Sequence, residues 1–291
     1  GLCTFFTNAR TPPVSPNGQP TQPEPQALEH LTQLPRPVYG HIQTLPNIVL
    51  GYRHAHPWGQ LSHAIGGVLE VHTDDGFYLV PPQRAVWVPA HVPHRVSCSG
   101  ETCLRSLYLE HAPRDWSPAQ CRVVAINPLL RELIRTFSEL PVHYDPGGAD
   151  GRLVQVLVDQ LAVACEQQLM LPMPHDSRLR ALCAHLQAQP DAPTGLNDWA
   201  LREGVSEKTL SRLFQRETGL SFRLWRQRMR LLSALPPLER GERVTDVALA
   251  CGYDSLSAFI AAFGKQFGQP PGAFFRHHSN DTDEASADET P

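Results

Sequence analysis

The 291-residue sequence contains no run of 18 or more apolar residues, although 41% of its residues are hydrophobic. A membrane-spanning helix needs about 20 such residues, so the sequence argues against a spanning segment. Its first residues also lack the basic and apolar stretches of a secretory signal, and a cytoplasmic protein is expected. The seven cysteines include no CxxC pair, which argues against a disulfide framework and against a cysteine-rich zinc site.

Lysine is almost absent, since Lys208 and Lys265 are the only lysines among 25 basic residues. The formal net charge of −4 argues at first against a nucleic-acid-binding protein. The charge is unevenly distributed, however: residues 1–175 carry 11 basic and 14 acidic side chains, whereas residues 176–278 carry 14 and 10. The positive charge is therefore concentrated in the C-terminal part of the chain, where it could meet phosphates.

Proline content, apolar patterning and charge divide the chain into five segments. Residues 11–37 contain eight prolines, which argues against packed structure in this segment. Short runs rich in Val, Ile, Leu, Tyr and Trp follow, and then apolar residues at helical spacing. The predicted segments are a Pro-rich flexible arm (1–37), a small β-barrel (38–112), linking helices (113–175), a helical basic domain (176–278) and an acidic disordered tail (279–291).

The linking segment contains two stretches with helical spacing of apolar residues. They cover Asn127–Leu140 and Asp150–Leu169, and good helix formers lie between the apolar positions. We expect two helices here, and we expect them to form a dimer contact.

The basic domain contains an internal repeat with an offset of 48 or 49 residues. In each copy an apolar helix ends at a glycine suited to a left-handed turn, and a serine two or three residues later can cap the next helix. Apolar residues at i, i+3 and i+4 then share one face of that second helix. The pattern predicts two helix-turn-helix units. The repeated residues are Ala200, Gly204, Ser206, Leu210, Phe214 and Gly219, and Ala248, Gly252, Ser255, Phe259, Phe263 and Gly268.

Two stretches in this domain, EGVSEKTLSRLFQRETGLSF and VTDVALACGYDSLSAFIAAFGKQFGQPPGAF, carry a family resemblance. They resemble the double helix-turn-helix domain of AraC-type transcription regulators, over roughly residues 176–276. The resemblance implies a promoter-binding regulator, usually a dimer, that acts on RNA polymerase. It also implies an N-terminal domain that senses an effector.

The second helix of each unit is expected to enter the major groove. In the first unit the face opposite the apolar residues is polar and basic. In the second unit Leu256, Ile260 and Ala261 leave little beyond methyl contacts and one hydroxyl, so weak base readout is expected. The predicted DNA-binding residues are Lys208, Thr209, Ser211, Arg212, Gln215, Arg216, Ser255, Ser257 and Lys265.

A connecting helix lies between the two units. Four arginines at positions 223, 226, 228 and 230 fall within about two turns and are expected to meet phosphates. Pro236-Pro237 follows, and proline disfavours helix at the preceding residue. We expect the connecting helix to stop or kink at Leu235.

Histidines in the β unit carry a second resemblance. His54, His56 and Gln60 have the spacing HxHxxxQ, and His94 lies in the later stretch QRAVWVPAHVPHRVSC. These motifs resemble the paired motifs of the cupin barrel, over about residues 42–110. In metal-binding cupins these positions hold the ion, so the resemblance implies that the four residues bind an effector or a metal. Gln60 departs from the family, which has glutamate there.

The chemistry of these side chains leaves three interpretations open. An HxH pair on a strand places both rings on one face, and an imidazole from a neighbouring strand can complete a face of three nitrogens. Such ligands suit zinc, nickel, copper or iron. Glutamine brings no charge, however, which lowers metal affinity. The cluster is therefore a divalent-metal site, a metal-free pocket for an organic effector, or purely structural.

The sequence thus predicts an α+β fold of two domains, a cupin-like β-barrel followed by an all-α double helix-turn-helix domain. The predicted function is a non-enzymatic, homodimeric transcription regulator that binds double-stranded promoter DNA and responds to a small molecule or a metal. The alternative is a cupin metalloenzyme with a fused DNA-binding domain. Gln60 argues against that alternative because it removes a carboxylate base or ligand.

Overall fold

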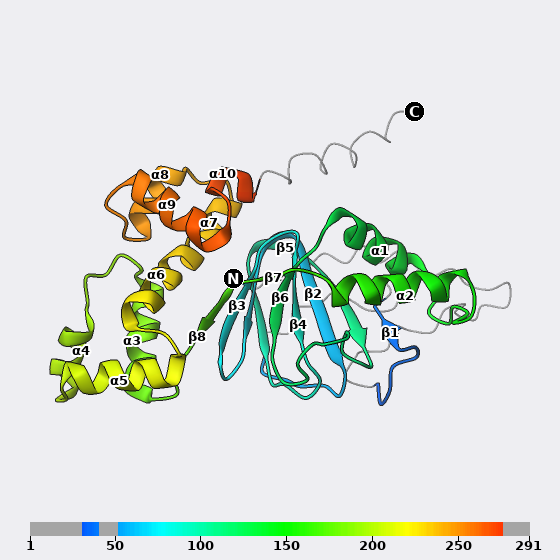
Figure 1. Ribbon diagram of the computed structural model, residues 1–291, viewed down its shortest axis with the longest axis horizontal. Coiled ribbons are helices and arrows are strands. Elements are labelled where there is room, and N and C mark those ends of the chain that lie inside the picture. The colour runs from blue at the N-terminus through cyan, green and yellow to red at the C-terminus, as the bar shows by residue number, and fades with distance from the viewer. Residues whose placement is uncertain (1–30, 41–51, 276–291) are drawn as a thin grey trace, which may run out of the picture.

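A computed structural model describes residues 31–40 and 52–275 of the protein (Figure 1). Most of the predicted arm, the acidic tail and the pair His277 and His278 lie outside the described residues. An antiparallel sheet domain precedes a helical domain, which confirms the predicted α+β fold of two domains. Among the described residues, no helix combines the length and the apolar character that crossing a bilayer requires.

The sheet is built on two long strands, β2 (Gly59–His72) and β5 (Arg95–Leu109), which pair along their whole length. The first half of β2 also pairs with β4 (Arg84–Val88), and its second half pairs with β3 (Gly76–Val80). A bulge around Gly66 and Gly67 separates the halves, and Gly67 has a φ of 75°, which favours glycine. The strands are β1 (Val38–Tyr39), β2 (Gly59–His72), β3 (Gly76–Val80), β4 (Arg84–Val88), β5 (Arg95–Leu109), β6 (Arg122–Ala125), β7 (Glu166–Gln167) and β8 (Met170–Pro172).

The sheet extends beyond residue 112, where the sequence pattern of strands ends. β6 pairs with β4, and the short strands β7 and β8 pair with β6 and β3. The helix expected over Asp150–Leu169 therefore ends early, because the backbone that follows Val163 bonds to the sheet. The Leu79 amide, for example, donates to the Leu169 carbonyl at 2.9 Å.

Two helices, α1 (Pro128–Glu139) and α2 (Ala149–Ala162), cover one face of the sheet. Asn127 caps α1 by accepting from the Leu130 amide at 2.8 Å, and Pro128 occupies the first turn. Phe137 of α1 and Leu157 of α2 are fully buried with strand residues such as Leu61. Both helices lie on the side of the sheet opposite the three helices of residues 177–218 (Figure 1).

The C-terminal domain has the predicted repeat of helix, turn and helix. Gly204 and Gly252 have φ values of 67° and 83°, and Ser206 and Ser255 cap the helices that follow. The two helix-turn-helix units are confirmed. The helices are α3 (Ser177–Ala188), α4 (Leu196–Glu203), α5 (Glu207–Thr218), α6 (Phe222–Ser233), α7 (Leu235–Glu239), α8 (Val244–Ala250), α9 (Leu256–Phe267) and α10 (Pro271–Phe274).

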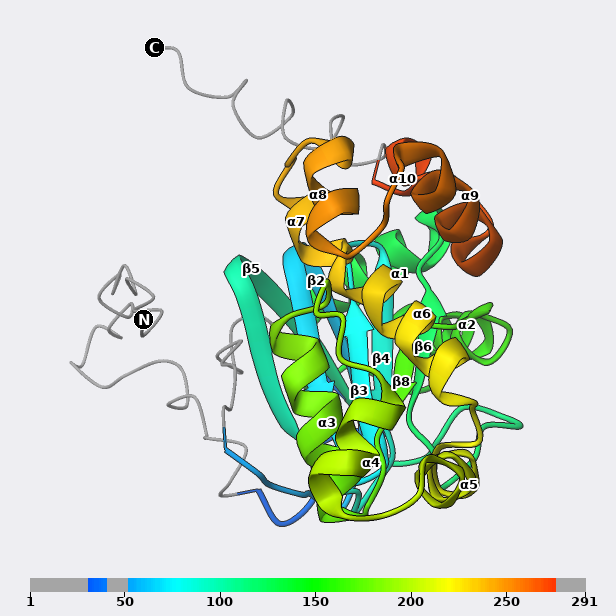
Figure 2. The ribbon, with the colours of Figure 1, turned by 90° about the vertical axis from the view of Figure 1, so that its left-hand side faces the viewer.

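The connecting helix breaks where the prolines predict. α6 ends at Ser233, and the short α7 begins at Leu235 with Pro236 in its first turn, where a missing N–H group leaves no helical bond unmade. Ala234 between them keeps a helical conformation. The consequence is a separate short helix that joins the two helix-turn-helix units (Figure 2).

The two domains contact each other directly. The Trp225 indole N–H of α6 donates to the Pro172 carbonyl of β8 at 2.7 Å. The Arg84 guanidinium of β4 lies 4.0 Å from the centre of the Phe274 ring of α10. A cation over an aromatic ring is attractive, most strongly where water is excluded. The sheet domain and the helical domain are thus joined by side-chain contacts as well as by the connecting chain.

Candidate DNA interface and ligand site

Helix α5 buries its apolar face and leaves its polar face free. Leu210 and Phe214 are fully buried, and Phe214 packs edge-on against Trp225 of α6 with ring centres 5.6 Å apart. Ser206 accepts from the Thr209 amide at 3.1 Å and so satisfies a free N–H at the start of the helix. This packing fixes the direction in which the basic side chains of α5 point.

All nine predicted DNA-binding residues are exposed. An open groove of about 640 Å³ runs along α5 beside Arg212 and Arg216, and Arg178 of α3 also lines it. Arg178 is paired with Asp176 at 2.8 Å, whereas Arg212 and Arg216 have no ion pair among the described residues. The excess positive charge of this groove is therefore carried by α5.

Helix α9, the counterpart of α5 in the second unit, presents a more apolar surface. Leu256 and Ile260 are 37% and 38% exposed, although their side chains are large and hydrophobic. Ser255 caps the helix through the Ala258 amide, and its hydroxyl lies 3.3 Å from that of Ser257. The exposed part of α9 thus offers fewer hydrogen-bonding side chains than that of α5, and its weaker base readout stays a prediction.

The expected phosphate contacts of the connecting helix need correction. Arg226 donates to the Thr194 carbonyl at 3.1 Å and to the Ala192 carbonyl, and Arg230 donates to the carbonyls of Pro190 and Gly252. These guanidiniums hold the α3–α4 loop and the second turn together. Arg223 is the exposed member of the four. The expectation was wrong for Arg226 and Arg230 because helical spacing alone does not show which face of a helix meets another segment.

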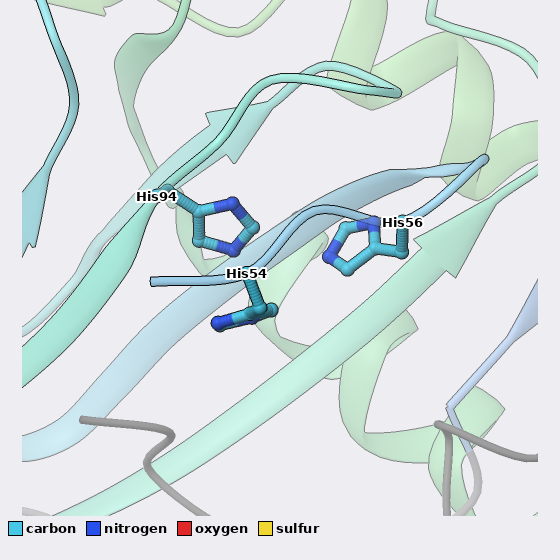
Figure 3. Close-up of side chains that lie close together, drawn as sticks. All are labelled: His54, His56 and His94. Atoms are coloured by element: carbon cyan, nitrogen blue, oxygen red, sulfur yellow. The ribbon is translucent and has the colours of Figure 1, made fainter. Parts of the chain in front are cut away.

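The histidines of the sheet domain come together around one point. His54 and His94 face each other across an antiparallel bridge, with both backbone N–H groups bonded at 2.9 Å. One ring nitrogen from each of His54, His56 and His94 lies within 4.8 Å of the others. The three rings lie side by side on two neighbouring segments (Figure 3). His94 is 1% exposed and His56 is 9% exposed, so protein surrounds most of the cluster.

Backbone carbonyls hold each of these rings in one orientation. The Nδ1 atoms of His54, His56 and His94 lie 2.9, 2.7 and 2.9 Å from the carbonyl oxygens of Tyr52, Trp58 and Val92. A carbonyl accepts a hydrogen bond, so Nδ1 of each ring donates and Nε2 is the nitrogen that is left for another partner. Histidine ligands of metals are held by the same kind of bond.

Gln60 contacts two of these free nitrogens. Its Oε1 position lies 2.8 Å from His56 Nε2 and 3.3 Å from His94 Nε2. Burial lowers the pKa of His56, and it lowers the pKa of His94 to about 4, so both rings are neutral at pH 7. A neutral ring with its proton on Nδ1 accepts at Nε2. The Gln60 amide is therefore satisfied when its NH₂ group faces the two rings.

The hydrogen-bond network continues through residues that lie outside the two sequence motifs. Gln60 lies 2.8 Å from the Ser62 hydroxyl, which lies 2.8 Å from the Ser106 hydroxyl of β5. Tyr108 of β5 packs edge-on against His56 with ring centres 5.9 Å apart. Alternation along β2 places Gln60 and Ser62 on one face, and that signal could have identified Ser62.

Comparison with known proteins gives two family matches. A model for a helix-turn-helix domain matches residues 199–277. A model for an AraC-like ligand binding domain matches residues 37–161, which contain strands β1 to β6, α1 and the histidine cluster.

The chain is 38% identical to the HTH-type transcriptional regulator NimR of Escherichia coli (strain K12), over 76% of this chain and 81% of NimR. It is 33% identical to the HTH-type transcriptional regulator RipA of Corynebacterium glutamicum, over 35% of this chain and 31% of RipA. The crystal structure of a DNA-binding transcriptional dual regulator from Escherichia coli K-12 is 25% identical, with a TM-score of 0.32 over 35% of this chain and 91% of that chain.

Proposed function

Because the chain belongs to the AraC-type transcription regulators, we propose that it binds promoter DNA with α5 as the main reader of base sequence. The observation that carries this proposal is the contrast between the two recognition helices. α5 exposes Arg212, Arg216 and Lys208 around an open groove, whereas α9 exposes Leu256 and Ile260. Arginine hydrogen bonds discriminate bases more strongly than methyl contacts do.

Selection of binding sites from random double-stranded DNA tests this function. The full chain should enrich one sequence with two half-sites about one helical turn apart. Gel-shift titration at fixed salt then compares the wild type with Arg212→Ala and with Arg114→Ala, an exposed arginine between β5 and β6. Loss of specificity in Arg212→Ala alone supports the proposal. Failure to enrich any sequence contradicts it.

The protein is proposed to act as a homodimer through α1 and α2. Leu129 of α1 is 54% exposed and Val156 of α2 is 44% exposed, although both are apolar. Burying such side chains against a second copy removes apolar surface from water. Sedimentation of the Leu129→Glu, Val156→Glu double variant should show a monomer. In this proposal the dimer binds promoter DNA in the cytoplasm, where it meets RNA polymerase, and it catalyses no reaction.

The effector site is proposed to be the cluster of His54, His56 and His94, with a divalent metal as its ligand. Three imidazoles with Nδ1 bonded to backbone carbonyls fit the requirements of a metal site. Zinc, nickel and iron accept such nitrogen donors. A bound ion would supply a positive centre that attracts an anionic ligand. Gln60, which faces the same nitrogens, would have to move or turn its oxygen inward.

Metal analysis of the untagged protein and calorimetric titration with zinc or nickel test this assignment. We expect His56→Ala to abolish binding and His185→Ala, in the α3 helix, to leave it unchanged. Protons compete with metal for imidazole, and because burial lowers the pKa of His94 to about 4, affinity should fall as the pH drops from 5.5 towards 4. An organic anion held by protonated histidines would show the opposite slope. Metal binding that survives His56→Ala would contradict the site.

A further inference from the structure

A cavity of about 440 Å³ lies between the sheet and α1, apart from the histidine cluster. His63 of β2 and Arg105 of β5 are directly paired across the two strands, so both side chains project from the same face of the sheet. Ile126 and Ile134 supply apolar walls. Its size falls in the range of small-molecule sites, which combine apolar walls with a few polar groups.

Two polar side chains of this cavity each lack one partner among the described residues, a hydrogen-bond partner for His63 and an ion-pair partner for Arg105. His63 is 8% exposed, and its Nε2 atom is buried without a hydrogen-bond partner among the described residues. Arg105 donates to the Ser138 hydroxyl at 3.1 Å but has no acidic partner in the described part of the chain. A guanidinium and an unsatisfied imidazole in one partly enclosed space favour an incoming anion.

The rim of the cavity adds two further cations. Arg131 and Arg135 of α1 line it, and both also lie near Glu132. Their charge is partly neutralised by that carboxylate, whereas the charge of Arg105 is not. Ile65 lies at the mouth and is 44% exposed although it is large and apolar. The site thus combines a cationic floor with apolar walls and an apolar entrance.

We propose that this cavity is a second ligand site, which binds a small organic carboxylate with an apolar body. The carboxylate would pair with the Arg105 guanidinium, which matches its planar geometry, and would lie beside the His63 ring. The alkyl or aryl body would pack against Ile126, Ile134 and Ile65. This site is independent of the histidine cluster, because the two lie on different faces of β2: Gln60 and Ser62 share one face, and His63 lies on the other.

Calorimetric titration of the full chain with sodium octanoate tests the proposal. We expect octanoate to bind, and 1-octanol and inorganic phosphate each to bind at least tenfold more weakly, because each lacks one half of the recognised chemistry. Arg105→Gln should weaken octanoate binding about tenfold or more, because it removes the charged group that donates to the carboxylate. Arg152→Gln, with an exposed arginine on α2, is the matched control.

A second variant keeps the proposal testable if Arg105→Gln fails to fold. Ile65→Trp places a larger side chain at an exposed position and should block octanoate binding while circular dichroism stays unchanged. His56→Ala should bind octanoate as the wild type does, so failure of the metal assignment leaves this test intact. The proposal is overturned if the wild type does not bind octanoate, if octanol binds equally well, or if binding survives both Arg105→Gln and Ile65→Trp.

Discussion

The Glu239 carboxylate of α7 accepts a hydrogen bond from the Gly67 backbone amide of β2 at 2.9 Å. The donor lies in the bulge that separates the two halves of β2. The acceptor lies in the short helix that exists because Pro236 and Pro237 end α6. One hydrogen bond therefore joins the ligand-binding domain to the segment between the two helix-turn-helix units.

Removal of this hydrogen bond should change the hydrogen exchange of its donor, the Gly67 amide. In Glu239→Ala we expect hydrogen exchange of the Gly67 amide to accelerate about fivefold, which corresponds to a loss of about 1 kcal/mol. Glu242→Ala is the matched control, because Glu242 pairs with Arg240 on the surface. Unchanged exchange at Gly67 in Glu239→Ala would show that the bond does not form in solution.

The two prolines are expected to set the geometry of the DNA complex. α6 has 12 residues and is about 18 Å long, while recognition helices in successive grooves lie about 34 Å apart. Replacing both prolines by Ala permits α6 and α7 to merge and turns Glu239 away from Gly67. We expect a changed half-site spacing or DNA bend, measured by footprinting and by gel mobility of permuted fragments. Identical footprints and bending would leave the prolines without this role, and the exposed Pro118→Ala serves as control.

The two recognition helices should differ in their sensitivity to substitution. Arg212→Ala in α5 is expected to cost about 1–3 kcal/mol of specific DNA binding and to relax preference at one base pair. Ser257→Ala in α9 should cost less than about 1 kcal/mol if that helix chiefly positions the protein. Gel-shift titrations at one salt concentration compare the two. A larger loss in Ser257→Ala would reverse the assignment.

Local signals made the C-terminal domain predictable. Gly204 and Gly252 adopt left-handed conformations. Ser206 and Ser255 each accept a hydrogen bond from the backbone amide three residues later, so each turn is encoded within a few positions. The break before Pro236 is local in the same way. Family motifs also pointed to His54, His56 and His94, although the HxH pair is not on a strand as expected: it precedes β2, and His54 forms an isolated bridge to His94.

Contacts between distant residues set the limits of prediction. β8 has three residues and exists because Gly76, Phe77 and Tyr78 pair with it from about 90 positions away. No periodicity appears in so short a segment, so the helix before it was predicted too long. Arg226 and Arg230 looked like phosphate ligands because the α3–α4 loop that binds them lies more than 30 residues away. The cavity at Arg105 likewise depends on α1 folding back over the sheet.

His63 provides a test of the sheet domain that does not depend on any ligand. Its ring is buried on the α1 side of β2, and burial together with the nearby Arg105 charge lowers its pKa from 6.5 to about 4. The unfolded chain therefore binds a proton at His63 as the pH falls through 6.5, while the folded chain stays neutral there until about pH 4. The contribution of neutral His63 to stability is present above pH 6.5 and is lost as the pH falls from 6.5 towards 4.

We expect this single group to lower the free energy of unfolding by about 2 kcal/mol between pH 7.5 and pH 5. Urea unfolding at both values measures the loss in the wild type and in His63→Leu, whose side chain cannot be protonated. The variant should lose about 2 kcal/mol less than the wild type over the same interval, whatever its stability at pH 7.5. Equal slopes in the wild type and His63→Leu would mean that water reaches the ring, and that His63 is not buried against α1.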